Sequence, residues 1–180
     1  FLETFRSISD MGLPKDFVTS VNVSVMVLLD DNFQKNFIDY IMQSGLALNQ
    51  IEIEITESCL IVDFEKVKST LSSLRRKGIR IAIDDFGTGF ASLNYLTQLD
   101  VDTIKIDKSF IGQLDNQAKS NRVIVESIIS MSHKLGYKVV AEGVETCNQL
   151  KILKALNCDF IQGYLISKPL NNFYFKSFII

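Results

Sequence analysis

Hydrophobic and polar residues alternate along the stretch Ile79–Gly89, which reads IRIAIDDFGTG. Successive side chains of a strand point to opposite faces, so the pattern predicts a strand with one apolar and one polar face. The apolar face carries Ile79, Ile81 and Ile83. Two adjacent carboxylates, Asp84 and Asp85, end the strand. The loop that follows consists of Phe86, Gly87, Thr88 and Gly89.

Two neighbouring acids at a strand end repel each other, and a cation between them relieves the repulsion. Hard metal ions such as Mg²⁺ prefer oxygen ligands. The end of this strand is therefore a candidate metal site. The hypothesis requires other strands to bring further polar side chains to the same place.

Segments with the period of a strand and segments with the period of a helix alternate along the rest of the chain. A period of two predicts strands at Phe17–Val25, Gln50–Glu57, Val101–Asp107, Tyr137–Glu142 and Phe160–Leu165. Apolar stripes predict helices at Asp30–Ser44, Asp63–Lys77, Phe90–Gln98, Gln117–Leu135, Thr146–Leu156 and, in the tail, Asn171–Ile180. Strands and helices that alternate through short connections are typical of parallel βαβ units and an α/β fold.

The number of strands bounds the architecture. The chain has 180 residues and about six predicted strands. A closed (β/α)₈ barrel has eight strands and typically about 250 residues, so we expect a modified TIM barrel that lacks about two strands at its N-terminal end. The first residues, FLETFRSISD, resemble the middle of a helix and include no initiator Met, which suggests a piece of a longer chain. An open, doubly wound sheet is the alternative.

Polar residues lie at or near the carboxyl ends of the predicted strands. They are Asn22, Glu54, Asp84, Lys105, Asp107, Glu142 and Gln162. Four of them, Glu54, Asp84, Lys105 and Asp107, lie opposite the isoleucine face. In a barrel the isoleucines pack against the outer helices, so these polar groups point inward at the end where barrel active sites form. Burying such an array is costly unless it binds something.

Charge and composition exclude some classes of function. A net charge of -2 and a pI near 5.4 argue against a general nucleic-acid binder, so we expect no DNA partner. The chain has one histidine and three cysteines without a CxxC pair, which favours oxygen ligands over a zinc site. Unpaired thiols and the lack of a long apolar segment lead us to expect a cytoplasmic location.

A nucleotide-binding loop is an alternative interpretation of the glycine-rich stretch. GTGFAS, at Gly87–Ser92, partly resembles a dinucleotide fingerprint, with Asp107 about 20 residues beyond Gly87. However, Ser92 stands at the third glycine position, and Asp84 and Asp85 would repel a pyrophosphate.

Two further groups of residues have structural interpretations. Glu52 shares the face of Glu54 but lies one layer lower, and we expect it to form a local salt bridge. The aromatic residues of the tail are expected to belong to a core or an interface; they are Phe173, Tyr174, Phe175 and Phe178. If strands are missing, two strand edges lack a partner, and we expect the tail or a second copy to cover them. Val23, Ile161 and Leu165 would then meet water.

Six short motifs follow one another along the chain. They are NVS at Asn22–Ser24, EITE at Glu54–Glu57, DDFGTGFASL at Asp84–Leu93, IKID at Ile104–Asp107, AEGVE at Ala141–Glu145 and QGY at Gln162–Tyr164. In this order and with these spacings, the motifs resemble the EAL family of cyclic di-GMP phosphodiesterases. The resemblance covers essentially the whole chain, and the motifs are specific as a set.

The resemblance implies a modified TIM barrel that hydrolyses one phosphodiester of cyclic di-GMP to linear pGpG with Mg²⁺ or Mn²⁺. Two ions are expected in the complete domain. The implied metal ligands are Asn22, Glu54, Asp84, Asp85 and Asp107. Lys105 would contact the attacking water, and Glu142 would serve the second ion or its waters. Glu57 would hold the glycine loop, which the family links to dimerisation and activation. Gln162 and Glu145 would support the site.

The chain departs from the family in one respect. The Glu-Ala-Leu motif that names the family is absent, and its glutamate is a metal ligand. We therefore expect residues 1–180 to form an EAL-type phosphodiesterase domain that is incomplete at its N-terminus, within a longer, active parent. The alternative is an inactive module that binds cyclic di-GMP or mediates dimerisation. A homodimer through the glycine loop, sensory or diguanylate-cyclase-like domains in the parent, and an upstream inner-membrane anchor are further expectations.

Overall fold

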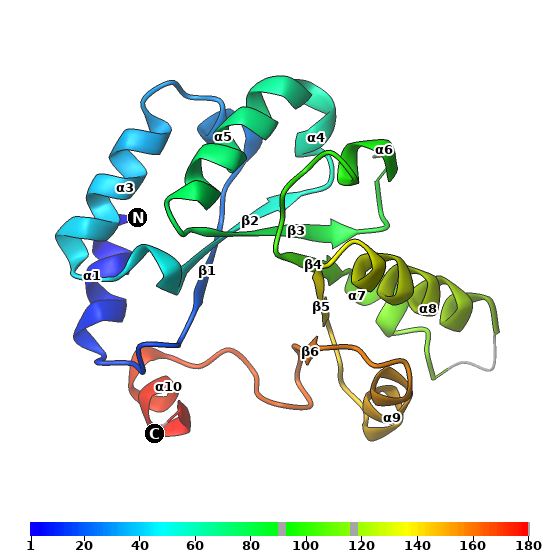
Figure 1. The fold of residues 1–180 in the computed structure, drawn as a ribbon. Coiled ribbons are helices and arrows are strands. Elements are labelled where there is room, and N and C mark those ends of the chain that lie inside the picture. The colour runs from blue at the N-terminus through cyan, green and yellow to red at the C-terminus, as the bar shows by residue number, and fades with distance from the viewer. Residues whose placement is uncertain (90–92, 116–118, 180) are drawn as a thin grey trace.

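The computed structural model describes residues 1–89, 93–115 and 119–179. Six parallel strands form one sheet in the order in which they occur in the sequence. They are β1 (Thr19–Asn22), β2 (Ile51–Thr56), β3 (Arg80–Phe86), β4 (Thr103–Ile106), β5 (Lys138–Ala141) and β6 (Phe160–Ile161). The sheet is strongly curved and forms part of a barrel (Figure 1). A doubly wound sheet requires a reversal of strand order, so the sequential order contradicts that alternative.

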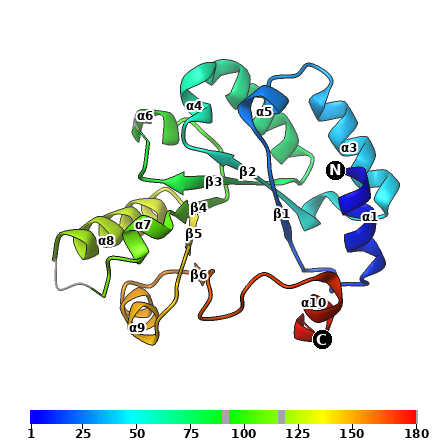
Figure 2. The ribbon, with the colours of Figure 1, turned by 180° about the vertical axis from the view of Figure 1, so that it is seen from behind.

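The helices are α1 (Leu2–Asp10), α2 (Val25–Leu28), α3 (Phe33–Ser44), α4 (Cys59–Val62), α5 (Phe64–Arg76), α6 (Leu93–Leu96), α7 (Lys108–Ile111), α8 (Lys119–Lys134), α9 (Cys147–Ala155), α10 (Asn172–Ile179) and the 3₁₀ turn η1 (Leu48–Gln50). The long helices α3, α5 and α8 lie on the outer side of the curved sheet (Figures 1 and 2). The parts of the predicted helices that fall at 90–92 and 117–118 lie outside the described residues. None of the helices in the described ranges is long and apolar enough to cross a membrane.

The core lies between the sheet and the helices. The isoleucines of the central strands are completely buried there: Ile53, Ile81, Ile83 and Ile104. Helix α5 packs against them with one face, on which Val67, Leu71 and Leu74 are buried. Each such side chain contributes about 1.5–3 kcal/mol through burial. Because strands alternate, this packing leaves the opposite face of the sheet free for the polar side chains.

The strands at the two edges are shorter than predicted. β1 stops at Asn22 because Ser24 already begins helix α2, and β6 ends at Ile161 rather than at Leu165. Gln162 therefore lies just past the last strand. The next residue, Gly163, packs so closely on the backbone of Val144 that any Cβ would overlap it, and its φ of 156° also favours glycine.

The tail lies along the open side of the curved sheet. The segment after β6 runs toward α10, which lies beside the chain that leads into β1 (Figures 1 and 2). There the ring of Phe175 packs edge-on against Phe17, with 5.8 Å between centroids. The other tail aromatics, Phe173, Tyr174 and Phe178, are exposed. The tail therefore contacts the start of the sheet, but most of its aromatic surface faces solvent.

The three residues expected to meet water behave differently. Val23 is buried, with only 4% of its surface exposed, so that prediction was wrong. Its backbone N–H donates to Glu54 O at 2.9 Å, which keeps the residue in the packed sheet. Ile161 and Leu165 are partly exposed and pack against the edge of the core.

Two aspartates hold the amino ends of the strands. Asp102, before β4, accepts hydrogen bonds from Arg75 and from the N–H of Ile81. Asp159, before β6, accepts from His133 Nε2 and Lys138 Nζ, both at 2.7 Å, and from the N–H of Val139 at 3.0 Å. Each carboxylate thus links the start of one strand to the strand immediately before it in the chain.

We expect Asp159→Asn to lower the free energy of unfolding by about 1.5–3 kcal/mol at pH 7. Burial raises the pKa of Asp159, but the hydrogen bonds from Lys138 and His133 outweigh it, and the pKa is lowered. A lowered pKa stabilises the fold above the unfolded value of about 3.9 and loses its effect as pH falls through the folded value. Thermal denaturation at several pH values tests this. If the difference in melting temperature between wild type and Asp159→Asn does not shrink in acid, the stabilising role of the Asp159 carboxylate is contradicted.

Candidate functional site

The ammonium group of Lys105 lies at the centre of the polar cluster inside the barrel. Its Nζ is 2.8 Å from Glu54 Oε1, 2.8 Å from Glu142 Oε1 and 3.1 Å from Asp84 Oδ1. The four residues come from β2, β3, β4 and the end of β5. The lysine side chain is 6% exposed, and the three carboxylates are only slightly more exposed. The structure therefore brings together four of the residues that the sequence singled out.

The alternation of strands positions these side chains. Lys105 lies between Ile104 and Ile106, which are both fully buried on the outer face. Glu54 is held in the same way between Ile53 and Ile55. Because these isoleucines anchor the strands against the helices, the charged side chains between them point into the barrel.

Burial and charge shift the pKa values within the cluster. Burial lowers the pKa of Lys105, but the hydrogen bonds and charges of Glu142 and Glu54 outweigh it, and the pKa is raised well above its ordinary value. Burial raises the pKa of Glu142, and the ion pair with Lys105 offsets only part of this. Lys105 is therefore a cation at neutral pH and links carboxylates that would otherwise repel one another.

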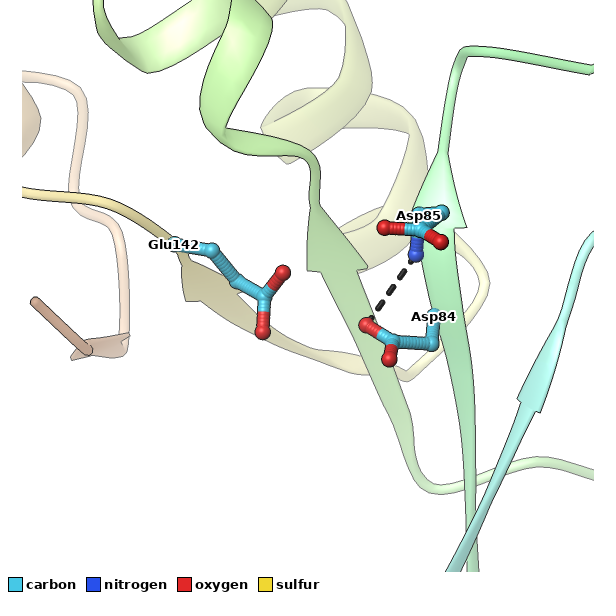
Figure 3. A group of neighbouring side chains, drawn as sticks. All are labelled: Asp84, Asp85 and Glu142. Atoms are coloured by element: carbon cyan, nitrogen blue, oxygen red, sulfur yellow. Dashed lines mark hydrogen bonds between the residues drawn. The ribbon is translucent and has the colours of Figure 1, made fainter. Parts of the chain in front are cut away.

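Asp84, Asp85 and Glu142 form a group of carboxylates next to this lysine. One oxygen from each lies within 4.8 Å of the others, and Figure 3 shows Asp84 and Glu142 facing the same space. Asp85 adopts a φ of 53°, which is uncommon outside glycine, and its N–H donates to Asp84 Oδ1 at 3.0 Å. Burial and the charges of Asp84 and Asp107 raise the pKa of Asp85.

The donor set fits a hard divalent cation. The closely spaced oxygen atoms belong to carboxylates, which are the ligands that Mg²⁺ and Mn²⁺ take. One ammonium group does not neutralise the four carboxylates of Glu54, Asp84, Asp85 and Glu142, so the site favours further positive charge. Burial is the largest cause of the raised pKa values of Asp85 and Glu142, and the charges of neighbouring carboxylates add to it.

Asp107 lies at the start of helix α7, where its Oδ1 accepts a hydrogen bond from the N–H of Ser109 at 3.0 Å. Burial raises its pKa, but the hydrogen bonds from Ser109 and Lys108 outweigh it, and the pKa is lowered. Asp107 therefore caps α7, and its charge acts on Asp85.

Glu57 holds the glycine loop. This buried carboxylate accepts hydrogen bonds through Oε2 from the N–H of Gly87 at 3.0 Å and of Gly89 at 3.1 Å. Thr88 Oγ1 donates to the carbonyl of Asp85 at 2.8 Å, and Phe86 closes the strand before the loop. A Cβ on Gly87 would lie 2.8 Å from the ring of Phe110, so the loop also packs closely on α7.

Asn22, Gln162 and Glu145 are all exposed. Asn22 is the register partner of Glu54, so it lies beside the cluster at the edge of the sheet. Within the described ranges, no hydrogen bond or ion pair joins these three side chains to Lys105 or its carboxylates. Their assignment as ligand or support stays a prediction.

One expectation from the sequence was wrong. Glu52 forms no salt bridge among the described residues, because the hydroxyls of Ser20 and Thr103 take both of its carboxylate oxygens. Neither hydroxyl was among the candidate residues. Each lies two positions before a candidate, at Asn22 and Lys105, and that spacing was the signal available in the sequence.

Known proteins are similar to this chain in both sequence and fold. The EAL domain family model matches residues 1–169. The "Cyclic di-GMP phosphodiesterase NbdA" of Pseudomonas aeruginosa is 44% identical over 128 residues, which are 71% of this chain and 16% of NbdA.

Two solved structures extend the comparison. The EAL enzyme Bd1971, bound to cAMP and cyclic-di-GMP, matches with a TM-score of 0.92 and 34% identity over 99% of this chain and 49% of that chain. BlrP1 of Klebsiella pneumoniae, solved as a manganese/cy-diGMP complex, matches with a TM-score of 0.88 and 30% identity over 95% of this chain and 43% of that chain. The chain thus spans about half of Bd1971 and a much smaller part of NbdA.

These matches confirm the α/β fold of the EAL type predicted from the motifs. This chain is a barrel segment that carries four carboxylates and a buried lysine at the carboxyl ends of its strands. Because it also matches the family model along residues 1–169, the chain belongs to the EAL domain family.

Proposed function

We propose that this chain contributes the catalytic core of a cyclic di-GMP phosphodiesterase, which hydrolyses the cyclic dinucleotide to linear pGpG with Mg²⁺ or Mn²⁺. The observation that carries the proposal is the buried cluster of Lys105 with Glu54, Asp84 and Glu142. The printed names and bound groups of NbdA, Bd1971 and BlrP1 support the same activity and a divalent ion.

Glu54, Asp84, Asp85 and Glu142 would hold the ions, with Asn22 at the rim. Bound divalent ions lower the pKa of water and offset the negative charge of a phosphodiester during in-line attack. Lys105 lies within hydrogen-bond distance of three of these carboxylates, so as a cation it can hold them in place and donate a hydrogen bond to a water between them. The barrel interior keeps these groups in place before the substrate binds.

The test is turnover of cyclic di-GMP, followed by chromatography of the nucleotides. We expect pGpG to form with Mg²⁺ or Mn²⁺ and its formation to stop when the ions are chelated.

The second candidate function is a regulatory module that binds cyclic di-GMP without cutting it. Calorimetry with cyclic di-GMP separates this function from hydrolysis. Tight binding of the nucleotide without product, in the presence of both ions, would favour the module and contradict hydrolysis.

We also propose that α8 contributes to a homodimer near the glycine loop. Val123 and Ile124 are exposed on α8, and Val123 has 58% of its surface exposed. On its inner side the same helix packs Ile128 against the position of Gly87, so α8 lies between the surface and the loop.

Val123→Asp should therefore shift the protein toward monomer in sedimentation experiments, because a charge on the apolar surface opposes its burial. Met42→Asp, at an exposed apolar residue of α3, is the control and should leave a larger share of dimer. A wild-type protein that sediments as a monomer at high concentration would contradict the dimer.

A further inference from the structure

A second polar layer lies inside the barrel, one step below the Lys105 cluster. Glu52 is its centre: Ser20 Oγ donates to Glu52 Oε1 at 2.8 Å, and Thr103 Oγ1 donates to Glu52 Oε2 at 3.0 Å. The carboxylate is half-buried, Thr103 is buried, and Ser20 is at the exposed edge. One side chain on β2 thus connects β1 to β4.

Each member of this lower layer lies two residues before a member of the site. Ser20 precedes Asn22 on β1, Glu52 precedes Glu54 on β2, and Thr103 precedes Lys105 on β4. Residues two apart on a strand point to the same face. A contact that holds the lower residue of each pair in place therefore also restricts the upper one.

Ala82, the β3 residue between Glu52 and Thr103, is small enough for the hydrogen bond between them to pass over it. β3 separates β2 from β4, and its residue at this level, Ala82, is completely buried and paired with Glu54 on one side and Thr103 on the other. Because Ala82 carries only a methyl group, Glu52 can reach Thr103 across it. Two residues later the same strand supplies Asp84, so all four strands carry one residue at the bridge level and one at the site.

We propose that Glu52 is a positioning residue for the metal and lysine cluster. By accepting a hydrogen bond through each oxygen, it sets the spacing of β1 and β4 relative to β2. This spacing fixes how far Asn22 lies from Glu54 and how Lys105 reaches Glu54 across β3. The proposal rests on the proposed function in one respect, because it takes Asn22 and Glu54 as metal ligands; the order of the Lys105 cluster does not depend on that.

The alternative is that Glu52 only stabilises the fold. Variants of the bridge separate the two roles. Glu52→Ala removes both hydrogen bonds, whereas Glu52→Gln keeps an acceptor and a donor that the two hydroxyls can use. Thr103→Val removes one bond at nearly constant volume, and Thr103→Ser restores the hydroxyl. Asp159→Asn, at the opposite end of the strands, is the control for a general loss of stability.

The first measurement is calorimetry with Mn²⁺. We expect Glu52→Ala and Thr103→Val to bind Mn²⁺ about tenfold or more weakly, as is typical for residues that orient ligands, and Glu52→Gln and Thr103→Ser to stay close to wild type. Asp159→Asn should keep its affinity despite its lower melting temperature. The proposal would be overturned if Asp159→Asn and Glu52→Ala lost equal amounts of Mn²⁺ affinity, or if Glu52→Ala bound Mn²⁺ as tightly as wild type.

The second measurement does not need the metal. Lys105 is protected from acylation because it is buried and ion-paired. We expect acetic anhydride to modify Lys105 at least about threefold faster in Glu52→Ala and Thr103→Val than in wild type and Asp159→Asn, since the cluster opens more often. If wild type binds no Mn²⁺, the metal assignment fails and this measurement alone decides. Unchanged labelling of Lys105 in folded Thr103→Val would overturn the positioning role.

Discussion

Replacement of Lys105 by methionine is expected to lower the turnover of cyclic di-GMP by about 10²–10³-fold, the range that loss of one positioned hydrogen-bond donor costs. The ammonium group contacts three carboxylates at 2.8–3.1 Å, and methionine cannot replace those contacts. Removing one partner of a buried ion pair also costs about 3–5 kcal/mol of stability, so thermal denaturation must accompany the kinetics.

Lys138→Met is the matched control for this experiment. Lys138 is also paired with an aspartate, at 2.7 Å, but its side chain is 64% exposed and lies at the amino end of the strands. We expect its turnover to stay close to wild type. A Lys105→Met protein that is folded and within a few-fold of Lys138→Met in turnover would contradict the assignment of Lys105.

Replacement of Asp84 by asparagine is expected to weaken Mn²⁺ binding on the order of a hundredfold or more and to abolish turnover. Asparagine keeps the shape and one oxygen, so the change removes mainly the negative charge. Asp84 shares its space with Asp85 and Glu142, and its Oδ1 also accepts from Lys105. Loss of that charge removes an ionic ligand at the point where the three carboxylates meet.

Calorimetry with Mn²⁺ and the chromatographic assay measure both effects. Asp115→Asn is the control, since Asp115 accepts hydrogen bonds from Thr146 and Asn148 in a loop and has no place in the cluster. Metal affinity in Asp84→Asn equal to that of Asp115→Asn would show that Asp84 is no ligand.

The central strands were predictable because two signals agree in them. In β2 and β3, alternation and β-branched residues both indicate a strand, and the structure places Ile51–Thr56 and Arg80–Phe86 where this pattern lies. The inward direction of Glu54, Asp84 and Lys105 followed from the same alternation. That part of the cluster needed no information beyond the sequence.

The short helices after the strands were not predictable in this way. Helices α2 and α4 continue apolar runs, VMVL and CLIV, that are too short to show a helical period. The predicted start of α3 at Asp30 was also early: Asp30 accepts a hydrogen bond from the N–H of Asn32 and forms a turn, and the helix begins at Phe33. Packing against neighbouring elements decides these cases, and the local sequence does not record it.

The partners of Glu52 show a different limit. The sequence placed Glu52 on the inner face, but its partners come from β1 and from β4, which is not adjacent to β2. Contacts across an intervening strand depend on barrel curvature and on the small size of Ala82. The residue pattern of each strand by itself does not contain that information.

The order of the strands has a consequence for how this chain folds. Every strand pairs with the strand before it in the sequence, so each new βα unit can add to an edge that the preceding unit has already formed. Such nearest-neighbour pairing limits the sequence separation of paired residues to the length of one βα unit, which bounds the entropy lost in closing each loop. During synthesis on the ribosome, the sheet can therefore grow from β1 toward β6 without waiting for the C-terminal residues.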